Sequence, residues 1–223
     1  MSTIPENLLQ PGAGGELAIA GPAGRLEALI ANPKQAATGL CVVCHPHPLF
    51  GGTMANKVVW TLANAALKSG CRVIRFNFRG VGRSEGLFDD ARGETEDALA
   101  VARCLQASAP ALPLVLAGFS FGGHVALKAA SRIPCAALVT IAPPMGRYLK
   151  TAEPPAHPQV PWLAVHSADD DTVSYAETRA AMMAYQPPPE FIHYDDAGHF
   201  FHGRLGELQA QVQAFLGKLA APG

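Results

Sequence analysis

The sequence predicts an α/β protein in which a mostly parallel sheet of eight strands, opened by an antiparallel hairpin, carries helices on both faces. Three observations support this fold class. Short apolar runs recur along the chain, and segments with helical periodicity lie between most of them. In addition, 49% of the 223 residues are hydrophobic while only 16% are charged. Such runs are typical of buried parallel strands, and their alternation with helices is typical of a doubly covered sheet.

The first two strands are predicted to form a hairpin at one edge of the sheet. Glu16–Ala20 and Arg25–Ala31 flank Gly21-Pro22-Ala23-Gly24, which is a turn signal. The other six strands are predicted to be buried on both faces, because each is a short and continuous apolar run. These runs are Leu40–Cys44, Val73–Phe78, Leu112–Ala117, Ala136–Ile141, Trp162–Val165 and Phe191–Tyr194.

Helices are predicted from apolar spacing and from cap signals. The segment Met54–Lys68, for example, places Val58, Leu62 and Ala66 on one helical face. Ser174-Tyr175-Ala176-Glu177 is a capping box, in which the serine and glutamate side chains bond the first free amides of a helix. The predicted helices are Met54–Lys68, Glu94–Gln106, His124–Ser131, Ser174–Tyr185 and Gly206–Leu219.

The whole chain, residues 1–223, is predicted to form a single domain. Its length suits one well-buried core, and no linker, internal repeat or low-complexity tract divides it. The one proline-rich stretch, at about residues 143–161, follows a predicted strand and is too short for a separate cap domain. We therefore expect a modest lid or rim there.

The charge balance argues against a nucleic-acid or membrane partner. The formal net charge is −1, the sequence pI is near 6.7, and Lys and Arg are scattered rather than clustered. No apolar run approaches the ~18 residues that span a bilayer, and residues 1–15 lack the pattern of a signal peptide. A cytoplasmic location and a small, roughly neutral substrate are expected. Nothing in the chain sets the oligomeric state, and a homodimer is compatible with it.

The five cysteines are predicted to be reduced packing residues, because they are odd in number and lie in or beside apolar stretches. Cys41-Val42-Val43-Cys44-His45 matches the haem attachment motif literally, and His45-Pro46-His47 offers apparent metal ligands. We reject both interpretations, because two strand residues three apart point to opposite faces. Gly80-Val81-Gly82-Arg83-Ser84 likewise lacks the spacing of a phosphate-binding loop. No cofactor or metal ion is expected.

Ser120 is the candidate nucleophile. It lies in Gly118-Phe119-Ser120-Phe121-Gly122, between an apolar run and a helix-compatible segment, and this is the strand-turn-helix context of a G-x-S-x-G turn. Such a turn is too tight for side chains two residues before and two after the serine. Gly118 and Gly122 meet that demand.

Two later segments supply partners for this serine. A serine nucleophile needs an adjacent base, and the base needs an acid that holds its tautomer. The segment His166–Ser174 contains three aspartates and follows a predicted strand, and Ala197–Phe201 contains His199 and follows the last strand. Serine, then aspartate, then histidine, each after a strand, is the chain order of α/β-hydrolases.

Four segments carry the resemblance to that family further. They are Cys44–Gly52, Arg75–Gly86, Ala117–Gly122 and Gly198–His202. With them, nearly the whole chain from about residue 16 resembles the α/β-hydrolase superfamily, and in particular its small cap-less bacterial serine hydrolases of the dienelactone-hydrolase and esterase type. The resemblance implies the α/β-hydrolase fold.

The resemblance also assigns the acid. The family's acid turn usually reads His-Gly-x-x-Asp-x-x-Val-Pro, so matching His166 and Val173 places the acid at Asp170, although serines replace the glycine and the proline. Asp169 and Asp171 therefore stay open as alternatives, and a solvated turn with a helix cap accounts for the aspartates that are not the acid.

Three histidines compete for the role of the base. His199 holds the family position. His193 lies inside a predicted strand, where a structural histidine is more typical, and His202 lies where the last helix begins. We therefore predict His199.

Acyl transfer also needs two N–H donors aimed at the developing oxyanion. In this fold the residue after the nucleophile supplies one, here Phe121, and the loop after the third strand supplies the other. Since Pro46 has no N–H, the second donor is predicted to be His47. Some of the side chains in these loops are expected to line an acyl pocket. The candidates are Phe50, Phe88, Phe121, Met145, Tyr148 and Phe200.

The predicted function is a serine hydrolase that cleaves small carboxylic esters through an acyl-enzyme, with Ser120, His199 and Asp170 as its triad. Peptidase, thioesterase and acyltransferase activity on the same fold stay open, although the access-restricting propeller of one peptidase type is absent from the sequence. Aspartate-nucleophile enzymes are disfavoured because the turn carries a serine. A catalytically silent binding or scaffold protein is the alternative from another class.

Overall fold

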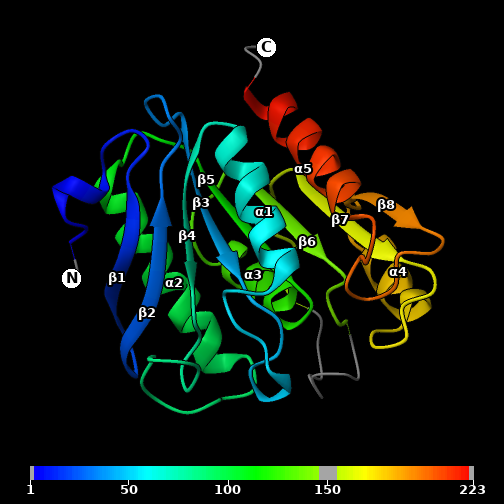
Figure 1. The fold of residues 1–223 in the computed structure, drawn as a ribbon. Coiled ribbons are helices and arrows are strands. Elements are labelled where there is room, and N and C mark those ends of the chain that lie inside the picture. The colour runs from blue at the N-terminus through cyan, green and yellow to red at the C-terminus, as the bar shows by residue number, and fades with distance from the viewer. Residues whose placement is uncertain (1–2, 146–154, 221–223) are drawn as a thin grey trace.

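Eight strands form one sheet. They are β1 Gly14–Gly21, β2 Gly24–Ala31, β3 Gly39–Cys44, β4 Cys71–Phe76, β5 Leu114–Phe119, β6 Ala137–Ile141, β7 Trp162–Ser167 and β8 Glu190–Tyr194. In the computed structural model, which describes residues 3–145 and 155–220, their order is β1-β2-β4-β3-β5-β6-β7-β8 (Figure 1). β2 pairs antiparallel with β1 and with β4, and the remaining pairs are parallel. The predicted fold class is confirmed.

Helices cover both faces of this sheet. They are α1 Lys57–Lys68, α2 Arg92–Ser108, α3 Phe121–Ala130, α4 Tyr175–Met183 and α5 Leu205–Ala220. Side chains of α1 and α5 pack on one face, whereas those of α2 and α3, with Met182 of α4, pack on the other. The short 3-10 helices η1 Glu6–Leu8 and η2 Pro48–Phe50 were not expected from the sequence.

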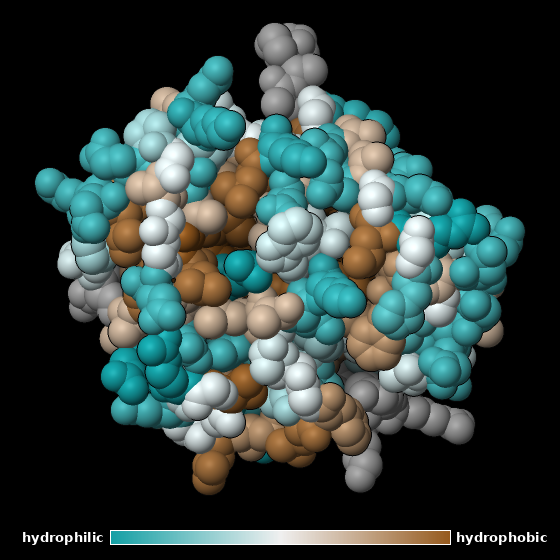
Figure 2. Space-filling view, viewed as in Figure 1, coloured by the Kyte–Doolittle hydropathy of each residue, from teal (hydrophilic) through white to brown (hydrophobic). Residues whose placement is uncertain are grey.

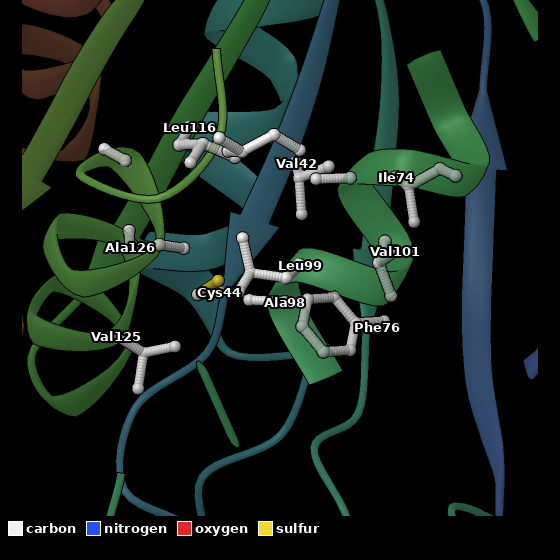
Figure 3. Close-up of a cluster of buried hydrophobic side chains, with 14 of the residues drawn as sticks. Val42, Cys44, Ile74, Phe76, Ala98, Leu99, Val101, Leu116, Val125 and Ala126 are labelled. Carbon is white, nitrogen blue, oxygen red and sulfur yellow. The ribbon is translucent and has the colours of Figure 1, made fainter. Parts of the chain in front are cut away.

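The two sides of the sheet carry separate hydrophobic clusters. Figure 3 shows part of one cluster, in which Cys44 of β3 lies among apolar side chains of α2 and α3. Cys41 belongs to the cluster on the opposite side. The prediction that these two cysteines point to opposite faces is therefore confirmed, and all five cysteines are free thiols.

Several strand boundaries differ from the prediction by one or two residues, and hydrogen bonding explains two of these differences. β4 ends at Phe76, since the Asn77 side chain accepts from the Met54 amide at 2.9 Å and the Phe78 amide donates to His45 Nε2 at 3.0 Å. β5 begins only after Pro113, which has no amide to donate to a neighbouring strand.

Much of the predicted lid falls on residues 146–154, which lie outside the described residues. The lid and the single-domain organisation therefore stay predictions. Within residues 3–145 and 155–220, none of the helices combines the length and the apolar character needed to cross a membrane.

Candidate active site

Ser120 occupies a tight turn between β5 and α3. Figure 1 shows these two elements meeting at the edge of the sheet where the parallel strands end. The backbone φ of Ser120 is 53°, in the left-handed region that is unfavourable for residues with a side chain. The surroundings hold this conformation. The Ser120 amide donates to the Ile141 carbonyl at 2.8 Å, and its own carbonyl accepts from the Gly123 amide at 2.8 Å.

The two glycines of the turn are required by close backbone contacts. A Cβ on Gly118 would lie 2.1 Å from the Gly122 carbonyl oxygen. A Cβ on Gly122 would lie 2.4 Å from the carbonyl oxygens of both Cys44 and His45. Real Cβ atoms do not approach oxygen so closely, so only glycine lets this turn pack against the end of β3. The steric demand inferred from the sequence is therefore present.

His199 lies between Ser120 and Asp170. It follows β8, and its Nε2 is 3.1 Å from Ser120 Oγ while its Nδ1 is 2.7 Å from Asp170 Oδ2. The rings of Phe119 and Phe200, at centroid distances of 4.9 and 5.1 Å, flank the imidazole. Because a carboxylate only accepts, His199 Nδ1 carries the proton. Nε2 is then free to accept from the Ser120 hydroxyl.

The Asp170 carboxylate is fully buried and accepts from several donors. Oδ1 accepts from the amides of Thr172 at 2.8 Å and Val173 at 2.7 Å, and Oδ2 lies beside two imidazoles. Burial pushes the pKa of Asp170 up, but hydrogen bonds from His166, His199 and the Val173 amide outweigh it. The net result is a pKa well below the usual value, so the group is an anion at neutral pH.

His166 is a contact that the sequence reasoning missed, since it used this residue only to align the acid turn. Its Nε2 lies 3.0 Å from Asp170 Oδ2 and 3.2 Å from the Val173 carbonyl oxygen. Both neighbours are acceptors, so Nε2 carries the proton. The side chain is fully buried, and its position four residues before the acid was the available signal. His166 thus donates to the same Asp170 oxygen as His199, whereas the backbone amides donate to the other oxygen.

The other two aspartates do not reach His199. Asp169 accepts from the Ser167 hydroxyl and from the Gly198 amide, so it ties the acid loop to the base loop. Asp171 is exposed and accepts from the Thr172 hydroxyl at 3.0 Å. Of the three aspartates, the structure brings only Asp170 to the serine and histidine.

The competing histidines also lie elsewhere. His193 is exposed on β8, 3.9 Å from the Asp195 carboxylate. His202 is exposed, with its ring 6.0 Å from that of Phe200. Neither has a contact with Ser120 among those the structure records. No group of three or more His, Cys, Asp and Glu side chains within residues 3–145 and 155–220 is placed to hold a metal ion.

His45 fixes the loop that contains the predicted donor His47. The Phe78 amide donates to His45 Nε2, so Nδ1 carries the proton and donates to the Pro46 carbonyl oxygen at 2.6 Å. That oxygen and the His47 N–H belong to one planar peptide unit, so fixing the first orients the second. Burial lowers the pKa of His45 to about 3, which keeps this ring neutral.

The predicted donors His47 and Phe121 lie beside the serine. His47 lines the same cavity as Ser120, and its Nδ1 accepts from the Leu49 amide at 3.2 Å, which caps η2. Phe121 is the first residue of α3, and the amides of a first helical turn have no acceptor within their own helix. The His47 and Phe121 rings are in contact, with centroids 4.9 Å apart.

A cavity of about 370 Å³ opens beside Ser120 and His199. Phe50 and Phe200 line it, as anticipated, together with Asn56 and Thr172. Of the other aromatic and sulfur side chains proposed for a pocket, Phe121 and Met145 are buried in the core. Phe88 is partly buried, with its ring 5.0 Å from that of His47. Tyr148 lies outside the described residues.

His124, one turn into α3, is buried, and its interaction with the Pro144 backbone favours the protonated ring less than burial disfavours it. Neither ring nitrogen has a hydrogen-bond partner of ordinary geometry within the described part of the chain. Burial, assisted by nearby Lys128, lowers the pKa of His124 to about 4. The unfolded chain titrates near 6.5, so between pH 6.5 and 4 it binds a proton that the folded protein excludes. Stability therefore falls as the pH drops through that window.

We expect His124→Leu to flatten this acid loss of stability. The wild-type melting temperature should fall between pH 6.5 and 4, and more gently in the variant, because one proton fewer is taken up on unfolding. His45 still contributes its own proton, so some slope remains. Thermal melts followed by circular dichroism measure the slope. The exposed His202→Leu serves as the control, and parallel curves for wild type and His124→Leu would contradict the prediction.

A protein-family profile and a relative of known sequence both match this chain. The profile of the α/β-hydrolase fold family matches residues 46–159. Uncharacterized protein RP471 of Rickettsia prowazekii is 32% identical over 204 residues, which cover 88% of this chain and 86% of that protein.

Two solved structures extend this similarity. The crystal structure of XC6422 from Xanthomonas campestris, an α/β serine hydrolase without a lid, superposes with a TM-score of 0.85 at 36% identity, covering 96% of this chain and 99% of that one. An α/β serine hydrolase homologue from Coxiella burnetii gives a TM-score of 0.83 at 39% identity, covering 90% and 96%. With the sheet order and the serine turn already described, these matches show that the chain belongs to the α/β-hydrolase fold family, in its group of small serine hydrolases.

Proposed function

We propose that the protein cleaves small carboxylic esters through an acyl-enzyme formed on Ser120. The observation that carries this proposal is the continuous hydrogen-bonded path from Ser120 Oγ through His199 to Asp170, with contacts of 3.1 and 2.7 Å. A serine hydroxyl is a weak nucleophile at neutral pH unless a base removes its proton. The tautomer that Asp170 imposes on His199 supplies that base.

In the first half of the reaction, His199 Nε2 takes the Ser120 proton as Oγ attacks the ester carbonyl carbon. The carbonyl oxygen becomes an oxyanion, for which the amides of His47 and Phe121 are the proposed donors. The C–O bond to the alcohol then breaks, and the leaving oxygen takes the proton from His199. The anionic Asp170 stabilises the imidazolium between these two transfers.

In the second half, water repeats the sequence on the acyl-enzyme. His199 removes a proton from the water, and the resulting tetrahedral intermediate collapses to the carboxylic acid as the Ser120 oxygen recovers its proton. Two donors from rigid elements, the first turn of α3 and the loop fixed by His45, need little rearrangement during this cycle. By analogy with measured oxyanion donors, each would lower the barrier by roughly 3 kcal/mol.

A fluorophosphonate probe tests the proposal directly. We expect the probe to label the wild-type protein at one site and to block hydrolysis of p-nitrophenyl acetate and butyrate. Ser120→Ala should lose both the label and the hydrolysis. Ser131→Ala is the matched control, because Ser131 is exposed at the end of α3 and bonds only the Lys128 carbonyl among the recorded contacts of its side chain. Unchanged labelling or hydrolysis in Ser120→Ala would remove this serine from the mechanism and favour a silent binding protein.

A further inference from the structure

The His199 imidazole lines the cavity beside Ser120. Phe200 and Thr172 line it with His199 from the loops that follow β8 and β7, and residues of the segment 46–56 line it from the connection between β3 and α1. In the proposed reaction His199 Nε2 must protonate the departing oxygen, so the alcohol portion of an ester has to lie next to this imidazole. The cavity is therefore placed to hold the alcohol portion.

No charged side chain lines the cavity within the described residues. Two of its polar side-chain oxygens already have partners. Asn56 Oδ1 caps α1 by accepting from the Val58 amide at 2.8 Å, and the Thr172 hydroxyl donates to Asp171. Burial lowers the pKa of His47, so this imidazole is a neutral acceptor for the Leu49 amide. An ionised ligand group would lose hydration here without gaining a partner of opposite charge.

Phe50 and Phe200 line this cavity, and they belong to the segments that follow β3 and β8. Phe50 in η2 is 77% exposed and Phe200 is 45% exposed, although both side chains are large and apolar. Apolar side chains gather along the lower edge in Figure 2, where Figure 1 places the loops after the carboxyl ends of the central strands. Exposed rings around a concave site are typical of ligand-binding surfaces.

Both phenylalanine rings of the cavity pack against other rings of the protein. Phe50 packs on the His47 ring at a centroid distance of 4.6 Å, and Phe200 meets the rings of His199 and Phe119 at 5.1 and 5.9 Å. Packing of this kind restricts each ring and leaves its outer part available. A planar ring between them would gain offset-stacked or edge-to-face contacts that a saturated ring of the same size cannot make.

We propose that this cavity selects esters of uncharged aromatic alcohols, with Phe50 and Phe200 as the specificity-determining side chains. The inference rests on the proposed function and adds the class of alcohol to it. In the step concerned, Ser120 Oγ bonds the acyl carbon while the C–O bond to the aromatic alcohol breaks. The departing oxygen takes the proton held on His199, and the neutral alcohol leaves the cavity.

Three acetate esters with alcohols of similar acidity test this selection. They are benzyl acetate, cyclohexylmethyl acetate and the acetate of 4-(hydroxymethyl)benzoate. Each of the two rings can form an aromatic pair with the benzyl group, so we expect kcat/KM for the benzyl ester to exceed that for the cyclohexylmethyl ester by at least about 5-fold. The carboxylate ester should be poorer than the benzyl ester by about 10-fold or more, because its charge finds no partner.

Matched variants assign the preference to the two rings. Phe50→Leu and Phe200→Leu should each lower the ratio of benzyl to cyclohexylmethyl kcat/KM, because leucine keeps apolar contact and removes the aromatic face. Trp60→Leu should leave the ratio unchanged, since Trp60 is 55% exposed on α1 and is not part of this cavity.

The outcomes separate this inference from the proposed function. Equal, Ser120-dependent hydrolysis of the benzyl and cyclohexylmethyl esters would overturn the aromatic selection and leave the esterase proposal standing. A ratio that neither phenylalanine variant changes would overturn the assignment to Phe50 and Phe200. Absence of any Ser120-dependent hydrolysis would overturn both proposals.

Discussion

Asp170→Asn is expected to lower kcat/KM for small esters about 10⁴-fold, the loss typical of a triad whose base is held in the wrong tautomer. The reason lies in the donors around the carboxylate. Oδ1 accepts from two backbone amides, which cannot reverse their polarity, so the asparagine carbonyl must occupy that side. The asparagine NH₂ then faces His199 Nδ1 and donates to it. His199 must therefore carry its proton on Nε2, where it cannot accept from Ser120.

Asp171→Asn and Asp169→Asn complete this test. Asp171 is exposed and bonds only the neighbouring Thr172 hydroxyl among its recorded side-chain contacts, so kcat/KM should stay close to wild type. Asp169→Asn keeps a side-chain oxygen that can accept from the Gly198 amide and the Ser167 hydroxyl, so it should have a smaller effect than Asp170→Asn. Kinetics with p-nitrophenyl acetate, together with melting curves that establish folding, measure all three. A large loss in Asp171→Asn with normal activity in Asp170→Asn would reassign the acid.

Asp97→Ala is expected to cost about 3–5 kcal/mol of the free energy of unfolding. Asp97 is fully buried in α2 and pairs with Arg79 through two side-chain contacts, Nη2 to Oδ1 at 2.7 Å and Nε to Oδ2 at 2.9 Å. Its Oδ2 also accepts from the Arg79 amide at 3.1 Å. Alanine would leave a guanidinium that is only 10% exposed without its counter-charge. Desolvation makes such an orphaned charge costly.

Chemical denaturation measures the free energy of unfolding of Asp97→Ala and of a control variant in a surface ion pair. Arg92 and Asp89 also form an ion pair at 3.0 Å, but their side chains are 76% and 42% exposed, so Arg92→Gln should cost less than ~1 kcal/mol. The double variant Arg79→Met/Asp97→Leu should recover part of the loss, because neither position of the pair then holds an unpaired buried charge. If Asp97→Ala proved no more destabilising than Arg92→Gln, the buried pair would have no special role in stability.

The sequence was sufficient for the sheet, and it also pointed to the three residues that the structure brings together, Ser120, His199 and Asp170. Continuous apolar runs place the strands, and a glycine-flanked serine places the turn, because both signals are local and steric. The choice of Asp170 over its neighbours depended on family resemblance, since three adjacent carboxylates are equivalent in composition. In the structure, backbone direction separates them. Asp170 turns toward His199, whereas Asp169 turns toward the Gly198 amide.

The roles of His45 and His166 could not be predicted from local sequence patterns. His45 and His166 act through hydrogen bonds to groups that only the folded chain brings near, such as the Phe78 amide and the Asp170 carboxylate. The predicted strand ran to Phe78, whereas β4 ends at Phe76, and the reason is similar. Phe78 is apolar and extends the run in sequence, yet its amide bonds to an imidazole instead of to a strand.

The order of the strands has a consequence for how the protein acquires activity during synthesis. Ser120 follows the fifth strand, but Asp170 and His199 follow the seventh and eighth, and these are added at one side of a sheet whose other side is made first. Under the proposed mechanism, a nascent chain lacking its final quarter would have the serine but neither its base nor its acid, and it would be inert. Because amino-terminal parts tend to fold first, turnover would report on the last stage of maturation.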